Sequence, residues 1–208
     1  MQHLVQARLW IHDTARKVGI ALTPDATSGP GGTFGPTATH WSRKEIMAES
    51  KSFPFSFIQH ASWDLLPPAD RQLLDEAKAA AGRAYAEYSH FHVGAALRMA
   101  NGDVHTGNNQ ENAAYPAGTC AERTALHAAM SLQPKGEVNT MAVVVIDIKT
   151  DVPVSPCGIC RQALLEQEGR QDKKPLRLLL GAENGVVIEV ASASHLLPLH
   201  FDRSFLKR

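Results

Sequence analysis

The sequence predicts an α/β protein, a three-layer α/β/α sandwich in which a mixed five-stranded sheet lies between two layers of helices. Segments with helical and strand periodicity alternate along the chain after residue 67, and such alternation is typical of helices that cover a central sheet. Met141–Ile148 is almost continuously apolar and rich in valine. A run of that kind indicates a strand that is covered on both faces.

The first regular elements are expected to be a helix and a hairpin. After Pro67-Pro68, apolar residues recur at helical spacing from Leu73 to Ala84. Phe91–Met99 then alternates apolar with other residues, and Asn101-Gly102, a strong turn signal, joins it to Val104–Thr106. The pattern therefore predicts two antiparallel strands after the first helix.

The alternation continues to the C-terminal end. Cys120–Leu132 is rich in alanine and is expected to be helical, and Ser155-Pro156 is expected to start another helix at Cys157. The remaining predicted elements are two strands and a short last helix, over Leu176–Leu180, Val186–Val190 and Ala193–Leu197. The predicted order is α, β, β, α, β, α, β, β, α.

Residues 1–62 are expected to be a poorly ordered N-terminal extension, and residues 63–208 a single domain. Between Thr23 and Ser42 the chain is dominated by Pro, Gly, Ser and Thr, a composition that buries too little apolar surface to offset chain entropy. A chain of 208 residues that is 44% hydrophobic can form one substantial core. Met47 offers an alternative start, so the extension need not belong to the working protein.

Composition argues against several classes of function. Lys+Arg and Asp+Glu both total 21, so the chain lacks the basic excess of a nucleic-acid-binding protein. No stretch approaches the roughly 20 apolar residues of a membrane-spanning helix, and no secretory signal is recognisable near the start. Three cysteines do not form a regular disulfide framework and favour a reducing compartment, so we expect a cytoplasmic protein with a small uncharged substrate.

The cysteines are concentrated in two motifs. Cys120-Ala121-Glu122 and Pro156-Cys157-Gly158-Ile159-Cys160 contain all three. Three thiolates leave the fourth position of a tetrahedral zinc ion open, as a catalytic site requires. Glu122 would then transfer protons beside a zinc-activated water.

Each motif has a simpler interpretation when it is taken alone. A cysteine is often a small buried hydrophobic residue, a C-x-x-C pair can be a redox motif, and Glu122 could face solvent in a first helical turn. The combination is more specific, because zinc held by cysteines beside a non-ligand glutamate is the signature of nucleobase deaminases.

Three thiolates around a zinc dication leave a formal negative charge that the protein has to offset. Helix N-termini at Cys120 and Cys157 would contribute, and Arg123 or Arg161 could hydrogen-bond to the thiolates. Arg123 is the better candidate because it neighbours Glu122. The histidines, including His90 and His92, show no convincing ligand spacing.

The sequence resembles the cytidine deaminases, specifically their small, homotetrameric, three-cysteine branch. The match runs from about Leu65 to Leu206, and the blocks occur in the family's order and at its spacings. The blocks that carry it are Tyr88–Leu97, Gly107–Tyr115, Thr119–Ala125, Pro156–Gln162 and Leu196–Pro198.

The resemblance implies a role for individual residues. Cys120, Cys157 and Cys160 match the family's zinc ligands, one ion per subunit, with Glu122 as the catalytic proton shuttle and Arg123 as the group that neutralises thiolate charge. Other matches concern the substrate and are Phe91 on the pyrimidine ring, Asn109 and Glu111 on a ribose hydroxyl, Ala113 and Tyr115 in the substrate loop, and Phe201 from a neighbouring subunit. The family commonly has proline at Glu87 and an aliphatic residue at Gln110, and neither departure touches the chemistry.

The implied function is zinc-dependent hydrolytic deamination of cytidine and deoxycytidine to uridine and deoxyuridine, a step of pyrimidine salvage. The implied assembly is a homotetramer with shared active sites. Three alternatives stay open: deamination of another cytosine nucleoside such as an antibiotic, deamination of a polynucleotide, and a non-catalytic zinc or redox module. Glu111 argues against the first, and the second usually has histidine where Cys120 stands.

Overall fold

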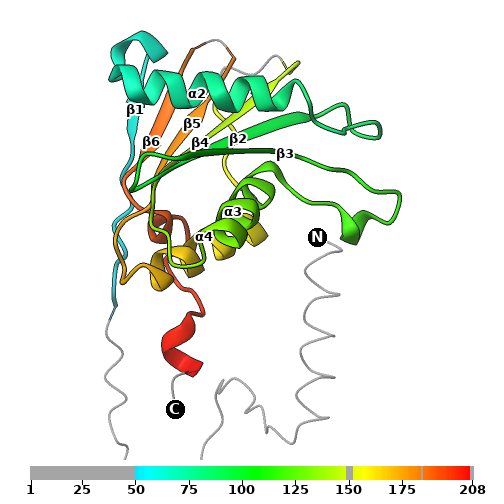
Figure 1. Cartoon of the computed structure of the whole chain (residues 1–208). Helices are drawn as coiled ribbons and strands as arrows, with labels where there is room; N and C mark the ends of the chain where they lie inside the picture. The colour runs from blue at the N-terminus through cyan, green and yellow to red at the C-terminus, as the bar shows by residue number, and fades with distance from the viewer. Residues whose placement is uncertain (1–49, 149–151, 184, 207–208) are drawn as a thin grey trace, which may run out of the picture. The chain divides into compact units, whose positions relative to one another are not determined.

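The computed structural model describes residues 50–148, 152–183 and 185–206. Its centre is one six-stranded sheet in the order β1-β6-β5-β4-β2-β3. Helix α2 covers one face of this sheet, and α3 and α4 cover the other (Figure 1). The elements are β1 Ile58–His60, η1 Trp63–Leu65, α2 Pro68–Ala81, β2 His92–Met99, β3 Val104–Asn108, η2 Tyr115–Ala117, α3 Ala121–Leu132, β4 Val138–Ile146, α4 Gly158–Arg170, β5 Arg177–Gly181, β6 Val187–Val190, η3 Ala193–Leu196 and η4 Arg203–Leu206.

The predicted fold class is confirmed, but the prediction of five strands is wrong. The additional strand, β1, pairs antiparallel with β6, with Ile58 opposite Glu189 and His60 opposite Val187. It has only three residues, too few for a period-two pattern to be recognised. The sheet is mixed because β4 and β5 are parallel, whereas the other neighbouring pairs are antiparallel.

The expected boundary at residue 63 falls between β1 and η1. Ile58–His60, which sequence analysis assigned to the extension, is therefore part of the sheet. The Pro- and Gly-rich segment between Thr23 and Ser42, with the rest of residues 1–49, lies outside the described residues.

Strand β4 separates two apolar clusters, as its continuous apolar sequence predicts. Ala142 and Val144 face α2 and pack in a cluster with Leu73 and Leu74. Met141, together with Val143, belongs to the larger cluster on the opposite face, which includes side chains of α3 and α4. Both faces of the sheet are thus covered by helices, and α3 and α4 pack on the same face.

Glycines let the helices approach the sheet closely. A Cβ on Gly94 of β2 would lie 1.9 Å from the carbonyl oxygen of Ala77 in α2. A Cβ on Gly107 of β3 would lie 2.3 Å from the backbone nitrogen of Ala125 in α3. Because real Cβ atoms cannot approach backbone atoms this closely, the position of α3 depends on Gly107.

Helix α4 is fastened by buried polar side chains. The Glu168 carboxylate accepts hydrogen bonds from the backbone nitrogens of Leu176, at 2.7 Å, and Ala193, at 2.9 Å. The Gln171 amide accepts from the nitrogen of Val138 at 2.9 Å and donates to its oxygen at 3.0 Å. Satisfied polar groups of this kind specify one arrangement of a helix, here against the starts of β4, β5 and η3.

A line of charged side chains joins α2 to the edge of the sheet. Asp70, whose side chain is 5% exposed, accepts from Arg98 at 2.8 Å and also from Arg177. Arg177 lies 3.5 Å from a Glu189 oxygen, and the other Glu189 oxygen lies 2.8 Å from Nε2 of His60. This network therefore connects α2, β2, β5, β6 and β1.

Candidate metal and substrate site

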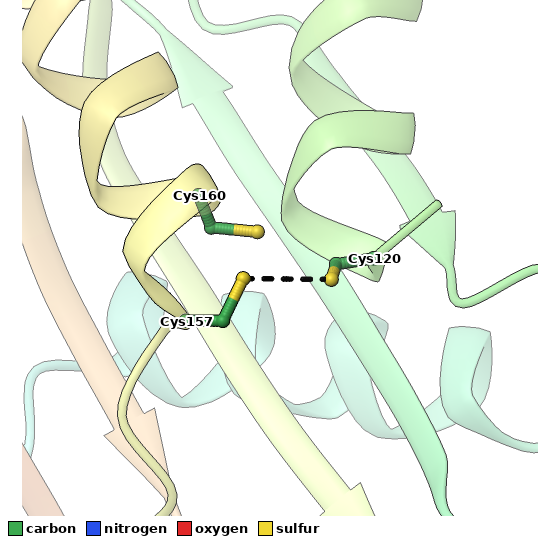
Figure 2. A group of neighbouring side chains, drawn as sticks. All are labelled: Cys120, Cys157 and Cys160. Carbon is green, nitrogen blue, oxygen red and sulfur yellow. Dashed lines mark hydrogen bonds between the residues drawn. The ribbon is translucent and has the colours of Figure 1, made fainter. Parts of the chain in front are cut away.

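Two helix N-termini meet at the candidate metal site. Cys120 is the N-cap residue of α3, Cys157 is the N-cap residue of α4, and Cys160 lies in the first turn of α4. Figure 2 shows the three side chains pointing toward one another from the two helices. Backbone N–H groups and the positive end of the helix dipole favour negative charge at such positions.

The sulfur geometry fits a zinc ion. The Sγ atoms of Cys120 and Cys157 lie 3.7 Å apart, and all three Sγ atoms lie within 4.8 Å of one another. Two thiolates on a tetrahedral zinc, with Zn–S bonds of about 2.3 Å, are separated by roughly 3.8 Å. Within the described ranges, no other group of three His, Cys, Asp or Glu side chains is arranged to hold a metal.

The site stabilises negative charge on the sulfur of Cys120. A hydrogen bond from Cys160 lowers the pKa of Cys120 to about 5, against the opposing effect of burial and with help from the Arg123 guanidinium. The same hydrogen bond, in which the Cys160 thiol donates its proton to the Cys120 sulfur, raises the pKa of Cys160, and burial adds to this effect. Zinc ligands have to be deprotonated, and a bound zinc ion would replace this proton.

The two arginines that sequence analysis considered differ in role. Arg123 lies beside the sulfurs of Cys120 and Cys160, and its Nε is buried without a hydrogen-bond partner. Arg161 instead donates to the carbonyl oxygens of Pro156, at 2.8 Å, and Leu196, at 3.3 Å. Arg123 is thus placed to offset thiolate charge, whereas Arg161 holds the backbone that precedes Cys157.

Glu122 is buried next to the sulfurs. Its exposed fraction is 5%, so the alternative of a solvent-facing residue in the first helical turn is wrong. Burial raises the pKa of Glu122 above its usual range, and the neighbouring Cys120 sulfur adds to the effect. A buried carboxyl with a raised pKa is suited to both accept and donate a proton.

A second group of predicted residues surrounds the turn before β2. The Asn109 amide accepts from the backbone nitrogen of Val93 at 2.8 Å and donates to the carbonyl oxygen of Phe91 at 2.9 Å. The Glu111 carboxylate accepts from the backbone nitrogens of Tyr88, at 2.8 Å, and Ser89, at 3.3 Å. The structure therefore brings Phe91, Asn109 and Glu111 together.

The other predicted substrate residues lie on exposed segments. Ala113 precedes η2, and Tyr115 in η2 is 78% exposed, with its ring edge-on to Tyr88 at 6.3 Å between centroids. Phe201 is 58% exposed and stacks on Phe205 at 5.6 Å. Exposed aromatic side chains are available to a ligand or to another subunit.

Sequence analysis assigned no role to Ser89. Its hydroxyl donates to Glu111 Oε1 at 2.5 Å and accepts from the backbone nitrogen of Phe91 at 3.1 Å. A serine that bonds to the nitrogen two residues later is a common turn motif. That local signal was present in the sequence, but the bond to Glu111 depends on the tertiary fold.

Comparison with known proteins identifies the family. Residues 67–171, which include the three cysteines and Glu122, match the family model described as the cytidine and deoxycytidylate deaminase zinc-binding region. The chain belongs to this deaminase family. Zinc is accordingly its cofactor, and the cysteine cluster has the geometry to bind it.

Individual relatives are similar over the same part of the chain. Cytidine deaminase from Halalkalibacterium halodurans is 44% identical over 130 residues, which cover 62% of this chain and 92% of that protein. The enzyme from Mycobacterium tuberculosis is 39% identical over 107 residues, covering 51% and 77%. The crystal structure of Burkholderia pseudomallei cytidine deaminase has a TM-score of 0.55 at 42% identity, covering 62% of this chain and 97% of that one.

Among the described parts of this deaminase-family chain, no helix has the length and apolar character needed to cross a membrane.

Proposed function

We propose that the protein catalyses the zinc-dependent hydrolytic deamination of cytidine and deoxycytidine, which yields uridine and deoxyuridine and releases ammonia. The observation that carries this proposal is the convergence of three cysteine sulfurs beside the buried carboxyl of Glu122. Relatives named cytidine deaminase, 44% identical over 92% of the relative's length in one case, support the choice of substrate. The reaction belongs to pyrimidine salvage.

Cys120, Cys157 and Cys160 would hold the metal. When bound, zinc supplies an activated water as nucleophile at neutral pH. The N-termini of α3 and α4 and the Arg123 guanidinium offset the negative charge of the thiolates. The exposed side chain of Cys157 leaves this site open on one side.

Glu122 moves the protons. Its carboxylate takes a proton from the attacking water and delivers it to N3 of cytosine as the C4–O bond forms. It then takes the remaining hydroxyl proton and gives it to the departing amine as the C4–N bond breaks. Water is consumed and ammonia is released, so one carboxyl serves as general base and then as general acid.

Asn109 and Glu111 would bind a sugar hydroxyl. The Asn109 amide uses one N–H and one oxygen acceptor site on the backbone, which leaves a second N–H to donate. Glu111 can accept the hydroxyl proton, because a carboxylate has about four acceptor sites and three are used here. A site built around this hydroxyl penalises a ligand without it.

The remaining substrate contacts come from aromatic and loop residues. Phe91 would pack on the pyrimidine ring, and Ala113 and Tyr115 would form the substrate loop. Phe201, on an exposed C-terminal segment, would reach the site of a neighbouring subunit in a homotetramer with shared active sites. The balance of 21 basic and 21 acidic residues supports a nucleoside substrate without a nucleic-acid partner. The three cysteines, which form no disulfide framework, support a cytoplasmic enzyme.

The competing functions have less support. A non-catalytic zinc or redox module would give no reason to bury Glu122 beside the sulfurs. A deaminase of other cytosine nucleosides, such as an antibiotic, would not need a carboxylate for a sugar hydroxyl. We also propose residues 63–208 as the catalytic domain, with Ile58–His60 as its additional edge strand.

Two measurements on the purified chain test the proposed function. Metal analysis should find about one zinc per chain, as a single three-cysteine site requires. The ultraviolet absorbance of cytidine and deoxycytidine should change with time, whereas that of free cytosine, which lacks the sugar, should change far more slowly. Zinc-loaded protein that converts neither nucleoside would refute the proposal.

A further inference from the structure

The segment over residues 87–91, which begins with a turn, leads into β2 and carries Phe91. Its conformation is unusual at His90, where φ is 55°, in the left-handed region. A residue with a Cβ is disfavoured in this region, so the surrounding bonds have to hold it. The turn is fastened on one side by Asn109 and on the other by Glu111.

Ser89 connects Glu111 to Phe91, two of the residues expected to bind the substrate. Its hydroxyl has one proton, which it donates to Glu111 Oε1 at 2.5 Å, and it accepts the backbone N–H of Phe91 at 3.1 Å. The hydroxyl therefore joins the carboxylate expected at the sugar to the residue expected at the base. The pKa of Glu111 is lowered, first by this bond from Ser89 and then by the backbone N–H of Tyr88.

The bonds also determine which carboxylate oxygen is free. Oε2 of Glu111 accepts from two backbone nitrogens, those of Tyr88 and Ser89, and both of its acceptor sites are used. Oε1 accepts only from the Ser89 hydroxyl. One acceptor site on Oε1 thus remains for a ligand, and its direction is set by the Ser89 hydroxyl.

We infer that Ser89 is a positioning residue, which orients Glu111 Oε1 toward a hydroxyl of the nucleoside sugar. This inference rests on the proposed deaminase function and adds a determinant of sugar selectivity to it. Ser89 need not touch the substrate. Ser89 acts through Glu111, so replacing it should change KM only for substrates that carry the hydroxyl bound by Glu111.

The test compares Ser89→Ala with the unchanged chain on cytidine, 2′-deoxycytidine and 3′-deoxycytidine. Ser89→Ala should raise KM about tenfold for cytidine and 2′-deoxycytidine, which both retain the 3′ hydroxyl. The change in kcat should be small, because the lost interaction contributes equally to binding of the ground state and of the transition state. For 3′-deoxycytidine, which lacks this hydroxyl, kcat/KM of Ser89→Ala should stay within about twofold of the wild-type value. Zinc content should remain the same.

Three further variants separate this role from a general loss of structure. Ser89→Thr retains a hydroxyl and should restore most of the selectivity. In a Glu111→Gln background, Ser89→Ala should have little additional effect, as coupled residues show. Ser62→Ala removes a similar exposed bond, from Ser62, the N-cap residue of η1, to Asp64 at 3.2 Å, and should leave every KM unchanged.

A failure of the inference about Ser89 can be distinguished from a failure of the proposed deaminase function. An equal loss on all three nucleosides, or additive effects of Ser89→Ala and Glu111→Gln, would overturn the role of Ser89 while deamination still stood. An unchanged, zinc-loaded chain that converts none of the nucleosides would overturn both. Calorimetric binding of the product uridine, compared with 3′-deoxyuridine, gives the same selectivity ratio without turnover.

Discussion

Glu122 combines burial with closeness to the sulfurs, and its substitution is the sharpest test at the scale of the residue. Glu122→Gln keeps the shape of the side chain but cannot accept or return a proton. We expect zinc content to be unchanged and kcat for cytidine to fall by about 10²–10⁴-fold. Metal analysis and the ultraviolet assay on the same preparation measure both quantities.

Cys157→Ala is the matched comparison for this variant. It removes one of the three sulfurs, so it should lose zinc as well as activity, because two thiolates bind the ion much less strongly. Full activity in Glu122→Gln, or loss of its zinc, would show that the carboxyl does not have the assigned role.

The sequence predicted the clustering of the three cysteines better than the contacts that surround them. Cys120, Cys157 and Cys160 were recognisable because the chain has only three thiols and places all of them in two short motifs at predicted helix starts, a pattern typical of metal binding. The contacts of Ser89 and Arg161 were not predicted, because each bonds to a group that the fold brings near from elsewhere in the chain. Periodicity and spacing contain no information about such contacts.

Among the secondary-structure elements, α3 determines where Cys120 and Glu122 lie, and Gly107 determines how closely α3 approaches β3. Gly107→Ala would place a Cβ 2.3 Å from the nitrogen of Ala125 and 2.8 Å from the oxygen of Ala121. The helix would have to move, so we expect a loss of about 3 kcal/mol in unfolding free energy and faster release of zinc to a chelator. Chemical denaturation and a colorimetric chelator assay measure these effects.

Gly82→Ala provides the control for this variant. The nearest atom to a Cβ at Gly82 is the oxygen of Ala79, at 3.7 Å, which is an ordinary contact. Stability and zinc release should therefore stay close to those of the unchanged chain. Equal behaviour of the two variants would mean that α3 does not depend on the absence of a side chain at Gly107.

Whether a segment forms a helix or a strand could be predicted wherever its apolar residues followed one clear pattern. The apolar run of β4 and the alanine-rich α3 were identified correctly. The start of α4 was predicted from Ser155-Pro156, but its attachment through Glu168 and Gln171 was not, because buried polar residues resemble exposed ones in sequence. Strand β1 was missed because three residues give too short a pattern.

For the whole molecule, the charged network around Asp70 should determine part of the acid stability. Burial opposes ionisation of Asp70, but the hydrogen bonds and charges of Arg98 and Arg177 outweigh it and lower the pKa of the carboxyl. This contribution to the free energy of unfolding is fully present at pH values above the pKa of Asp70 in the unfolded chain, about 3.9. It is lost as the pH falls through the lower pKa that Asp70 has in the folded protein.

Asp70→Asn tests this account by urea unfolding between pH 7 and pH 3. At pH 7 the variant should be less stable by on the order of 3 kcal/mol, because Arg98 and Arg177 both lose the carboxylate of Asp70. The difference from the unchanged chain should shrink toward pH 3. Asp75→Asn, on an exposed position of the same helix, should change neither value, and a constant deficit of Asp70→Asn at every pH would contradict the prediction.

Truncation tests the extent of the domain. A chain that begins at Ser50 retains every element described here, and we expect it to keep its zinc and its activity. A chain that begins at Trp63 lacks β1 and the 2.8 Å bond from His60 to Glu189, and should be less stable by about 2 kcal/mol. Thermal unfolding compares the two. Equal melting temperatures would show that β1 contributes nothing to stability.

Strand β1 also changes which backbone groups of the sheet are left for other molecules. Without it, β6, with the sequence Val187-Ile188-Glu189-Val190, would present unpaired N–H and C=O groups along a strand of high β-propensity. Such an edge is a template for uncontrolled addition of strands from other chains. Strand β1 pairs along this side of β6 and becomes the edge itself, and an edge strand of three residues is a much shorter template for such addition.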